Sequence, residues 1–221
     1  MKIIAVIDPF IQTPALHCHN RLVRELPAKL LYHQPQLMAL STLEKNHADG
    51  YIVLGSASHV TLPLPWHAPL ADFLVSELQR QKPVLGICFG HQLLGQKFGG
   101  VVDYFESEDV KLTGAREVEL TQDLYGLAKG EKLRLAVSHK QVVKTLSPEL
   151  EEVGRGLGND LIRHRMLPFL GTQAHAEASL DFCSRESMLL GPEAITQVQR
   201  DGMRLVTSFF RHHGLLAGST V

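Results

Sequence analysis

The sequence contains few cysteines and no long apolar segment. Three cysteines occur among its 221 residues, at Cys18, Cys88 and Cys183, and an odd, sparse count does not suit a disulfide framework. No apolar run is long enough to span a bilayer. The short N-terminal run ends at Asp8-Pro9 without the small-residue cleavage site of a secretory signal. We therefore expect a reduced, cytoplasmic protein with no membrane partner.

Neither sign of charge predominates in the chain. Lys and Arg total 22, against 23 for Asp and Glu, and no run of basic residues indicates a nucleic-acid partner. The apolar fraction is ordinary for a globular protein, and the length suits one sizeable domain rather than two. We predict one domain over residues 1–213 and a short, frayed tail over residues 214–221.

Short apolar runs alternate with amphipathic segments in the first half of the chain. Apolar runs bounded by turn residues predict buried strands, over residues 2–7, 51–55 and 83–88. Apolar positions that share one helical face predict helices, over residues 69–80 and 90–98 and, interrupted by Pro27, over about residues 18–32. Strands that alternate with helices predict an α/β fold with a parallel sheet.

The pattern changes after residue 101. Polar and apolar residues alternate over 116–121 and 133–138 with no long helix between them, which predicts a smaller antiparallel strand region. A further strand is predicted over residues 167–174. A closing helix is predicted over residues 195–213, although Gly202 lies inside it.

The segment around Cys88 carries the strongest chemical signal. An apolar strand runs into Gly86-Ile87-Cys88-Phe89-Gly90, and a helix follows. This is the cysteine form of a nucleophile elbow, in which small neighbours allow a sharp turn. The turn places the sulfur near a helix N-terminus, whose dipole favours a thiolate, and it leaves the Phe89 N–H free to hold an oxyanion. We predict that Cys88 is a nucleophile.

A cysteine nucleophile needs a base, and the base needs a group that orients it. His175 and Glu177 are two residues apart, so in extended backbone their side chains point to the same side. The segment follows a predicted strand and would emerge at a strand end. We predict that His175 is the base and that Glu177 orients it.

Three segments in this order resemble the class I glutamine amidotransferase family. Residues 86–92 match its Gly-x-Cys-x-Gly-His-Gln elbow, Ser138-His139 matches a Ser-His segment, and residues 173–177 match three of five positions of a late Gln-Phe-His-Pro-Glu segment. The resemblance covers nearly the whole chain. It implies a single three-layer, flavodoxin-like domain with a mostly parallel central sheet flanked by helices, and hydrolysis of the glutamine side-chain amide through a cysteine thioester.

The resemblance also implies roles for residues around the predicted nucleophile. It implies that Gln92 and the backbone at Ser138 and His139 contact the glutamyl group. It further implies that the backbone at Gly55 and Ser56, where the family has Gly-Gly-Pro, completes the oxyanion hole. It implies no cofactor and no metal. No synthetase segment follows the predicted closing helix, so we expect the released ammonia to serve a partner subunit or a separate acceptor.

Other functions fit the sequence less well. The family's Ser-His-Gly-Asp loop is Ser-His-Lys140-Gln141 here, which keeps open hydrolysis of a larger γ-glutamyl amide or peptide by the same three residues. A catalytically inactive binding relative is disfavoured, because such relatives typically lose the nucleophile or the base. His17-Cys18-His19 offers zinc-ligand chemistry, but adjacent residues rarely converge on one ion. No phosphate-binding loop motif occurs.

Overall fold

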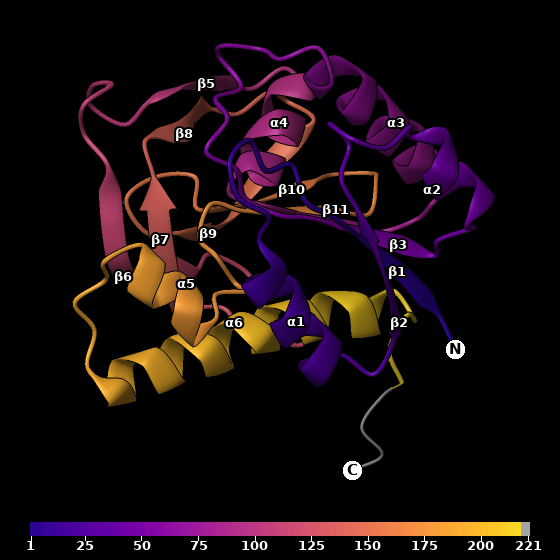
Figure 1. Cartoon of the computed structure of the whole chain (residues 1–221). Coiled ribbons are helices and arrows are strands. Elements are labelled where there is room, and N and C mark those ends of the chain that lie inside the picture. Colours follow the sequence, from indigo (N-terminus) through magenta and orange to yellow (C-terminus); the bar gives the residue numbers. More distant parts are fainter. Residues whose placement is uncertain (218–221) are drawn as a thin grey trace.

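A mixed nine-stranded sheet forms the centre of the protein. A computed structural model describes residues 1–217, and in it the strand order is β2-β1-β3-β4-β11-β10-β9-β6-β7 (Figure 1). The first five strands in this order run parallel to their neighbours, and the other four pair antiparallel. The strands of this sheet are β1 (Ile3–Ile7), β2 (Lys29–His33), β3 (Gly50–Val53), β4 (Val84–Ile87), β6 (Leu112–Leu120), β7 (Lys132–His139), β9 (Leu150–Arg155), β10 (Leu161–His164) and β11 (Phe169–Thr172).

Helices cover both faces of the sheet, and a small antiparallel pair lies beside it. Figure 1 shows α3 and α4 on one face and α1 and α6 on the other. Within residues 1–217 no helix has the length and apolar character to cross a membrane. The remaining elements are α1 (Leu16–Glu25), α2 (Ser41–Lys45), α3 (His67–Gln79), α4 (Phe89–Lys97), α5 (Leu180–Arg185), α6 (Pro192–His212) and the two-stranded sheet of β5 (Val101–Tyr104) with β8 (Gln141–Thr145).

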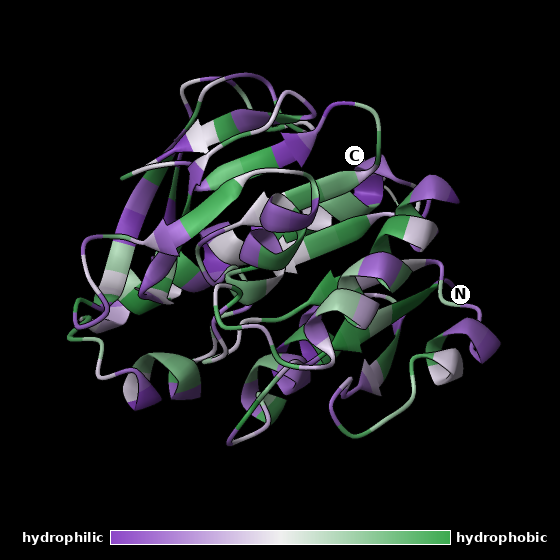
Figure 2. Ribbon diagram, turned by 90° about the horizontal axis from the view of Figure 1, so that it is seen from above, coloured by the Kyte–Doolittle hydropathy of each residue, from purple (hydrophilic) through white to green (hydrophobic). Residues whose placement is uncertain are grey.

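The parallel strands are buried on both faces because their side chains alternate between two cores. In β1, Ile4 and Val6 join the core that includes helix α6, whereas Ala5 and Ile7 join the core that includes helices α3 and α4. A strand buried on both faces needs apolar residues at every position. The strands at the centre of Figure 2 are coloured mainly as hydrophobic, as this requirement predicts.

The structure confirms the predicted fold class. The five parallel strands follow the flavodoxin-like order, and the antiparallel strands lie together beyond β11. The helical prediction over about residues 18–32 is wrong in its second half: α1 ends at Glu25, and β2 pairs in parallel with β1. Pro27 lacks the N–H that a continuing helix would need, so the chain leaves the helix there and extends.

The tail does not fray where it was expected to. Leu215 and Leu216 are buried against the core that includes α6, so the prediction of a frayed segment from Gly214 is wrong for these residues. Residues 218–221 of the predicted tail lie outside the described residues. The division into a domain over residues 1–213 and a tail stays a prediction.

Gly202 allows a close contact between α6 and the segment after β11. A Cβ built on Gly202 would overlap the carbonyl oxygen of Ala176 and lie 2.9 Å from its carbonyl carbon. Ala176 stands between His175 and Glu177 in the sequence. The glycine therefore sets how closely α6 approaches the backbone that carries two predicted site residues.

We predict that Gly202→Ala destabilises the protein by about 1–3 kcal/mol, because the added methyl overpacks a rigid backbone contact. In an exposed helix the same change would be stabilising. Urea unfolding measures the difference. Gly158→Ala is the matched control, because its Cβ would meet no atom within 4 Å, and it should leave the midpoint unchanged or slightly raised. Equal effects of the two substitutions would contradict the packing role of Gly202.

Candidate active site

Cys88 occupies a strained turn between β4 and α4. Its backbone has φ 48° and ψ −96°, in the left-handed half of the map that side chains rarely adopt. A Cβ on Gly86 would lie 2.7 Å from the Gly90 carbonyl group, and a Cβ on Gly90 would lie 2.7 Å from the Val53 carbonyl oxygen. The two glycines therefore allow the turn to close, as the elbow motif predicts.

His175 and Glu177 lie beyond the end of β11, the strand next to β4. His175 Nδ1 donates to Glu177 Oε1 over 2.9 Å, and both side chains are buried. The His175 N–H donates to the Ala136 carbonyl over 2.7 Å, which fixes this segment to β7. The carboxylate thus sets the tautomer of the imidazole, leaving Nε2 without a hydrogen bond among the described residues.

The electrostatic environment favours a positive charge on His175. Burial alone would lower its pKa, but the Glu177 carboxylate and, after it, Cys88 hold the pKa well above its usual value. The ring reaches this position because Gly55 lacks a side chain: a Cβ there would lie 2.5 Å from His175 Cε1 and 3.4 Å from Cys88 Cβ. His175 and Cys88 therefore pack against the same glycine.

The predicted oxyanion hole consists of three backbone N–H groups. Phe89 is the first residue of α4, and the first N–H groups of a helix have no partner within it. The N–H groups of Gly55 and Ser56 carry no hydrogen bond within residues 1–217. The Ser56 hydroxyl donates to the Pro9 carbonyl over 2.6 Å, which holds the turn after β3. Their assignment to an oxyanion hole stays a prediction.

A chain of buried amides stands next to the sulfur. Gln92 Nε2 donates to the Gln141 carbonyl over 2.7 Å and to Gln173 Oε1 over 3.1 Å. Gln173 Nε2 in turn lies 3.7 Å from Cys88 Sγ. Gln92 is thus a buried member of a network and not a solvated helix residue. Gln173 was not predicted as a site residue, although its place two residues before His175 puts it on the same side of extended backbone.

Ser138 and His139 come from the end of β7. The Ser138 carbonyl oxygen lies 3.9 Å from Cys88 Sγ. His139 is buried, and burial, with a smaller contribution from Arg116, lowers its pKa to about 3. A histidine that stays neutral at pH 7 beside the cationic His175 adds no second positive charge to the site.

A cavity of about 680 Å³ joins these residues. That volume is typical of small-molecule sites. The structure brings eight of the nine predicted residues to its wall: Cys88, His175, Glu177, Gly55, Ser56, Gln92, Ser138 and His139. The ninth, Phe89, is predicted to act through its backbone, and its side chain is buried.

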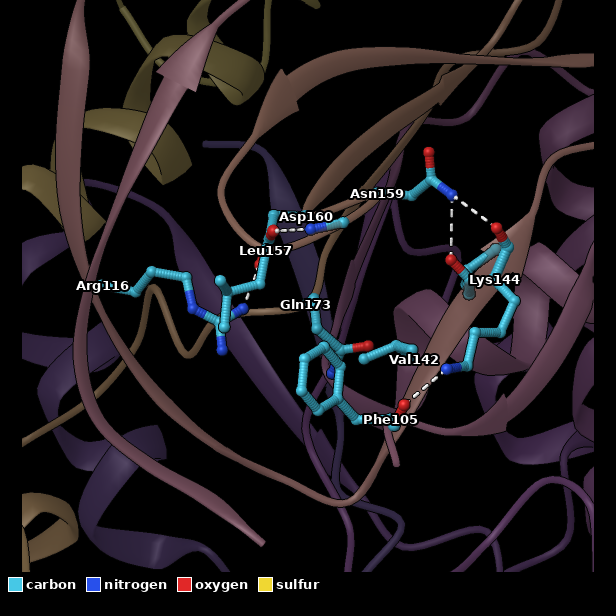
Figure 3. Close-up of a pocket in the computed structure, with 10 residues that line it drawn as sticks. Phe105, Arg116, Val142, Lys144, Leu157, Asn159, Asp160 and Gln173 are labelled. Carbon is cyan, nitrogen blue, oxygen red and sulfur yellow. Dashed lines mark hydrogen bonds and ion pairs between the residues drawn. The ribbon is translucent and has the colours of Figure 1, made fainter. Parts of the chain in front are cut away.

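A smaller cavity of about 160 Å³ lies behind Gln173. Figure 3 shows Gln173 between Arg116 on one side and Phe105 and Val142 on the other. Arg116 pairs with the buried Asp160 over 2.8 Å. Gln173 lines this space and also lies 3.7 Å from Cys88 Sγ through its Nε2, and the two cavities share no lining residue.

The three adjacent residues with zinc-ligand chemistry point to different places. His17 Nδ1 meets the Ser179 hydroxyl over 3.2 Å, Cys18 is buried in a hydrophobic cluster, and the His19 ring packs on Tyr32. Within the described part of the chain no group of three or more His, Cys, Asp or Glu residues is placed to hold a metal ion.

Comparison with known proteins identifies the family to which the chain is similar. The model for "Glutamine amidotransferase class-I" matches residues 6–185. A subunit of the glutamine-hydrolysing GMP synthase of Methanopyrus kandleri is 34% identical over 137 residues, 60% of this chain and 68% of that protein. The corresponding subunit of Methanospirillum hungatei is 37% identical over 105 residues, 46% of this chain and 54% of that protein, so the chain spans about half of some relatives. A solved glutamine amidotransferase from Thermotoga maritima shares the fold, with TM-score 0.66 at 18% identity over 96% of this chain and 98% of that one.

We predict that iodoacetamide at pH 6 labels Cys88 well before Cys18 and Cys183. Burial raises the pKa of the Cys18 and Cys183 thiols, whereas Cys88 lies beside His175, whose pKa is raised, and reactive cysteines lie in such electropositive surroundings. Mass spectrometry of the labelled peptides gives the three rates. Equal rates would contradict the special environment of Cys88.

We further predict that Glu177→Gln slows the labelling of Cys88 at pH 6 by about 10-fold or more, since one pKa unit changes a charged fraction up to tenfold. The Glu177 carboxylate is the largest of the groups that raise the pKa of His175, so without it burial lowers that pKa and the positive charge next to the sulfur is diminished. Glu119→Gln, an exposed change on β6, is the control and should label at the parent rate. Parent-like labelling of Glu177→Gln would refute this coupling.

Proposed function

Because the chain belongs to the class I glutamine amidotransferase family, we propose that it hydrolyses the glutamine side-chain amide through a thioester on Cys88. One observation carries the proposal. Cys88 stands in a strained elbow beside His175, whose Nδ1 is held 2.9 Å from Glu177, and all three line one cavity. This arrangement supports the roles of nucleophile, base and orienting group that acyl transfer requires.

The first half of the proposed reaction releases ammonia. The reaction starts with the proton of the Cys88–His175 pair on His175, so that Sγ attacks as a thiolate and bonds to the amide carbon. The oxygen becomes an oxyanion, which the N–H groups of Phe89 and of Gly55 or Ser56 stabilise. When the intermediate collapses, the carbon–nitrogen bond breaks and His175 gives its proton to the leaving nitrogen. Ammonia leaves, and a glutamyl thioester remains.

The second half releases glutamate. Water attacks the thioester carbon, and His175 takes one of its protons. Collapse of the second intermediate breaks the carbon–sulfur bond, and the departing Cys88 thiolate is again paired with the protonated His175. Water and glutamine are consumed, glutamate and ammonia are formed, and the site returns to its starting state. Glu177 stabilises the imidazolium that exists in both halves.

We also propose that the ammonia serves a partner synthase subunit or a separate acceptor. The relatives that are named as subunits of a glutamine-hydrolysing GMP synthase support a partner of this class. The three free cysteines support a reducing, cytoplasmic setting.

We predict that Cys88→Ala and His175→Ala each lower glutamine hydrolysis by at least about 10³-fold, because neither thioester formation nor its hydrolysis proceeds without them. Glu177→Ala should be at least about 10-fold more active than either of those variants, since an orienting group is less essential than a base. Glutamate release measures all three. Parent-like rates in His175→Ala would refute the triad.

A second candidate function is hydrolysis of a larger γ-glutamyl amide or peptide by the same residues. Two observations favour it: the cavity of about 680 Å³ extends well beyond Cys88, and Lys140 and Gln141 in its wall replace the family's Gly-Asp. The thioester chemistry is unchanged, and only the leaving group differs.

We predict that glutamine is turned over at a rate equal to or above that of γ-glutamyl amides and peptides offered in parallel to the purified chain. A site built for a larger leaving group would instead prefer one such compound by orders of magnitude, through contacts made to that group. Product glutamate is measured for each substrate. Strong peptide hydrolysis with negligible glutamine turnover would replace the first function by the second.

A further inference from the structure

A pair of opposite charges lies in the wall of the large cavity. Glu186 follows α5, accepts a hydrogen bond from the Ser138 hydroxyl, and forms an ion pair with Lys111 over 2.6 Å. Lys111, Ser138 and Glu186 all line the cavity that contains Cys88. The catalytic steps above use neither charge.

Both charged groups have bonding capacity left. The contacts from Lys111 and Ser138 end on the same atom of Glu186, Oε2. Within residues 1–217 no hydrogen bond uses its Oε1. The Lys111 ammonium has three donors and uses one of them on Glu186. One carboxylate oxygen and two ammonium protons are therefore available to a ligand.

Glu186 is held in its charged form. Burial alone would raise its pKa, but Lys111 and the Ser138 hydroxyl, with the positive His175 nearby, lower the pKa below its usual value. An ionised carboxylate beside an ammonium presents one negative and one positive point, side by side. The head group of an amino acid carries one ammonium and one carboxylate, so its positive charge can meet the carboxylate of the pair and its negative charge the ammonium.

Ser138 sets the distance between this pair and the nucleophile. Its carbonyl oxygen lies 3.9 Å from Cys88 Sγ, and its hydroxyl bonds Glu186. One residue therefore separates the sulfur from the carboxylate. In a γ-glutamyl group the reacting carbon and the α-nitrogen are four bonds apart, roughly 5 Å when extended. The spacing suits a substrate that reaches from the sulfur to the charge pair.

The expected acidic group of the neighbouring loop is absent. Where the family pattern has Asp, this chain has Gln141, whose side-chain amide donates to the Thr61 hydroxyl. Glu186 lies one residue beyond the segment that the family model matches. A carboxylate from a different part of the chain thus stands in the wall of the cavity.

We propose that Glu186 and Lys111 form the subsite that recognises the α-ammonium and α-carboxylate of the γ-glutamyl substrate, with Glu186 binding the ammonium and Lys111 the carboxylate. The inference rests on the proposed amide hydrolysis and applies equally to glutamine and to larger γ-glutamyl compounds. It makes the two residues determinants of specificity that do not take part in the bond-breaking steps.

The test uses two reagents that modify Cys88 and differ in their head group. The diazoketone 6-diazo-5-oxonorleucine carries the amino-acid head of glutamine, whereas iodoacetamide has none. In Glu186→Gln and in Lys111→Gln, the second-order rate of diazoketone labelling should fall about 10- to 100-fold, since each loses a charge-assisted contact. Iodoacetamide labelling should change less than about 3-fold in both, which excludes misfolding. Glu119→Gln should match the parent with both reagents.

The outcomes separate the subsite from the reaction. Saturable labelling of the parent by the diazoketone, with unchanged rates in both variants, overturns the subsite and leaves the proposed hydrolysis standing. Equal losses with both reagents also overturn it, because the pair would then support the fold or the thiol rather than the ligand. No saturable labelling in the parent overturns the hydrolysis and the subsite together. A loss confined to the diazoketone supports the proposal.

Discussion

The left-handed backbone at Cys88 is the constraint around which the site is arranged. A residue with a side chain holds φ 48° only if the surrounding structure compensates for the strain. Here the compensation comes from contacts that leave no room for a methyl group at Gly86 or Gly90. The turn presents the sulfur at the carboxyl end of a parallel strand, and open α/β sheets bind ligands at this edge.

The buried His175–Glu177 pair is better explained by the proposed reaction than by a contribution to the stability of the fold. Removing two charges from water costs several kcal/mol per ion, and their attraction only partly offsets that cost. Such a pair is weak evidence of a contribution to stability. In the proposed reaction the imidazolium forms twice, and a preformed carboxylate next to it requires no reorganisation at the moment of proton transfer.

The sequence predicts what local patterns encode and misses what depends on distant partners. Strands β1, β3 and β4 are continuous apolar runs, so their positions could be predicted. The elbow could be predicted because its glycines occur where the backbone is too crowded for a side chain. Strands β9 and β10 were not predicted, because buried and exposed positions do not alternate regularly along them. Strand β2 was not predicted, because the leucines on both sides of Pro27 occur at a spacing typical of a helix. Glu186 carries no signal of its own, since its link to Ser138 spans 48 residues.

The pairing of β4 with β11 has a consequence for the order of folding. The two strands lie in register as neighbours, yet Gln173 and Cys88 are 85 residues apart in the chain. Contacts of such long range form slowly, because loop-closure entropy is lost before the contacts form. A growing chain that has emerged only through Cys88 does not yet contain His175 and Glu177. His175 and Glu177 follow β11, and Gly202 of α6 packs closely on Ala176 between them, so the proposed triad can assemble only after most of the chain has been synthesised.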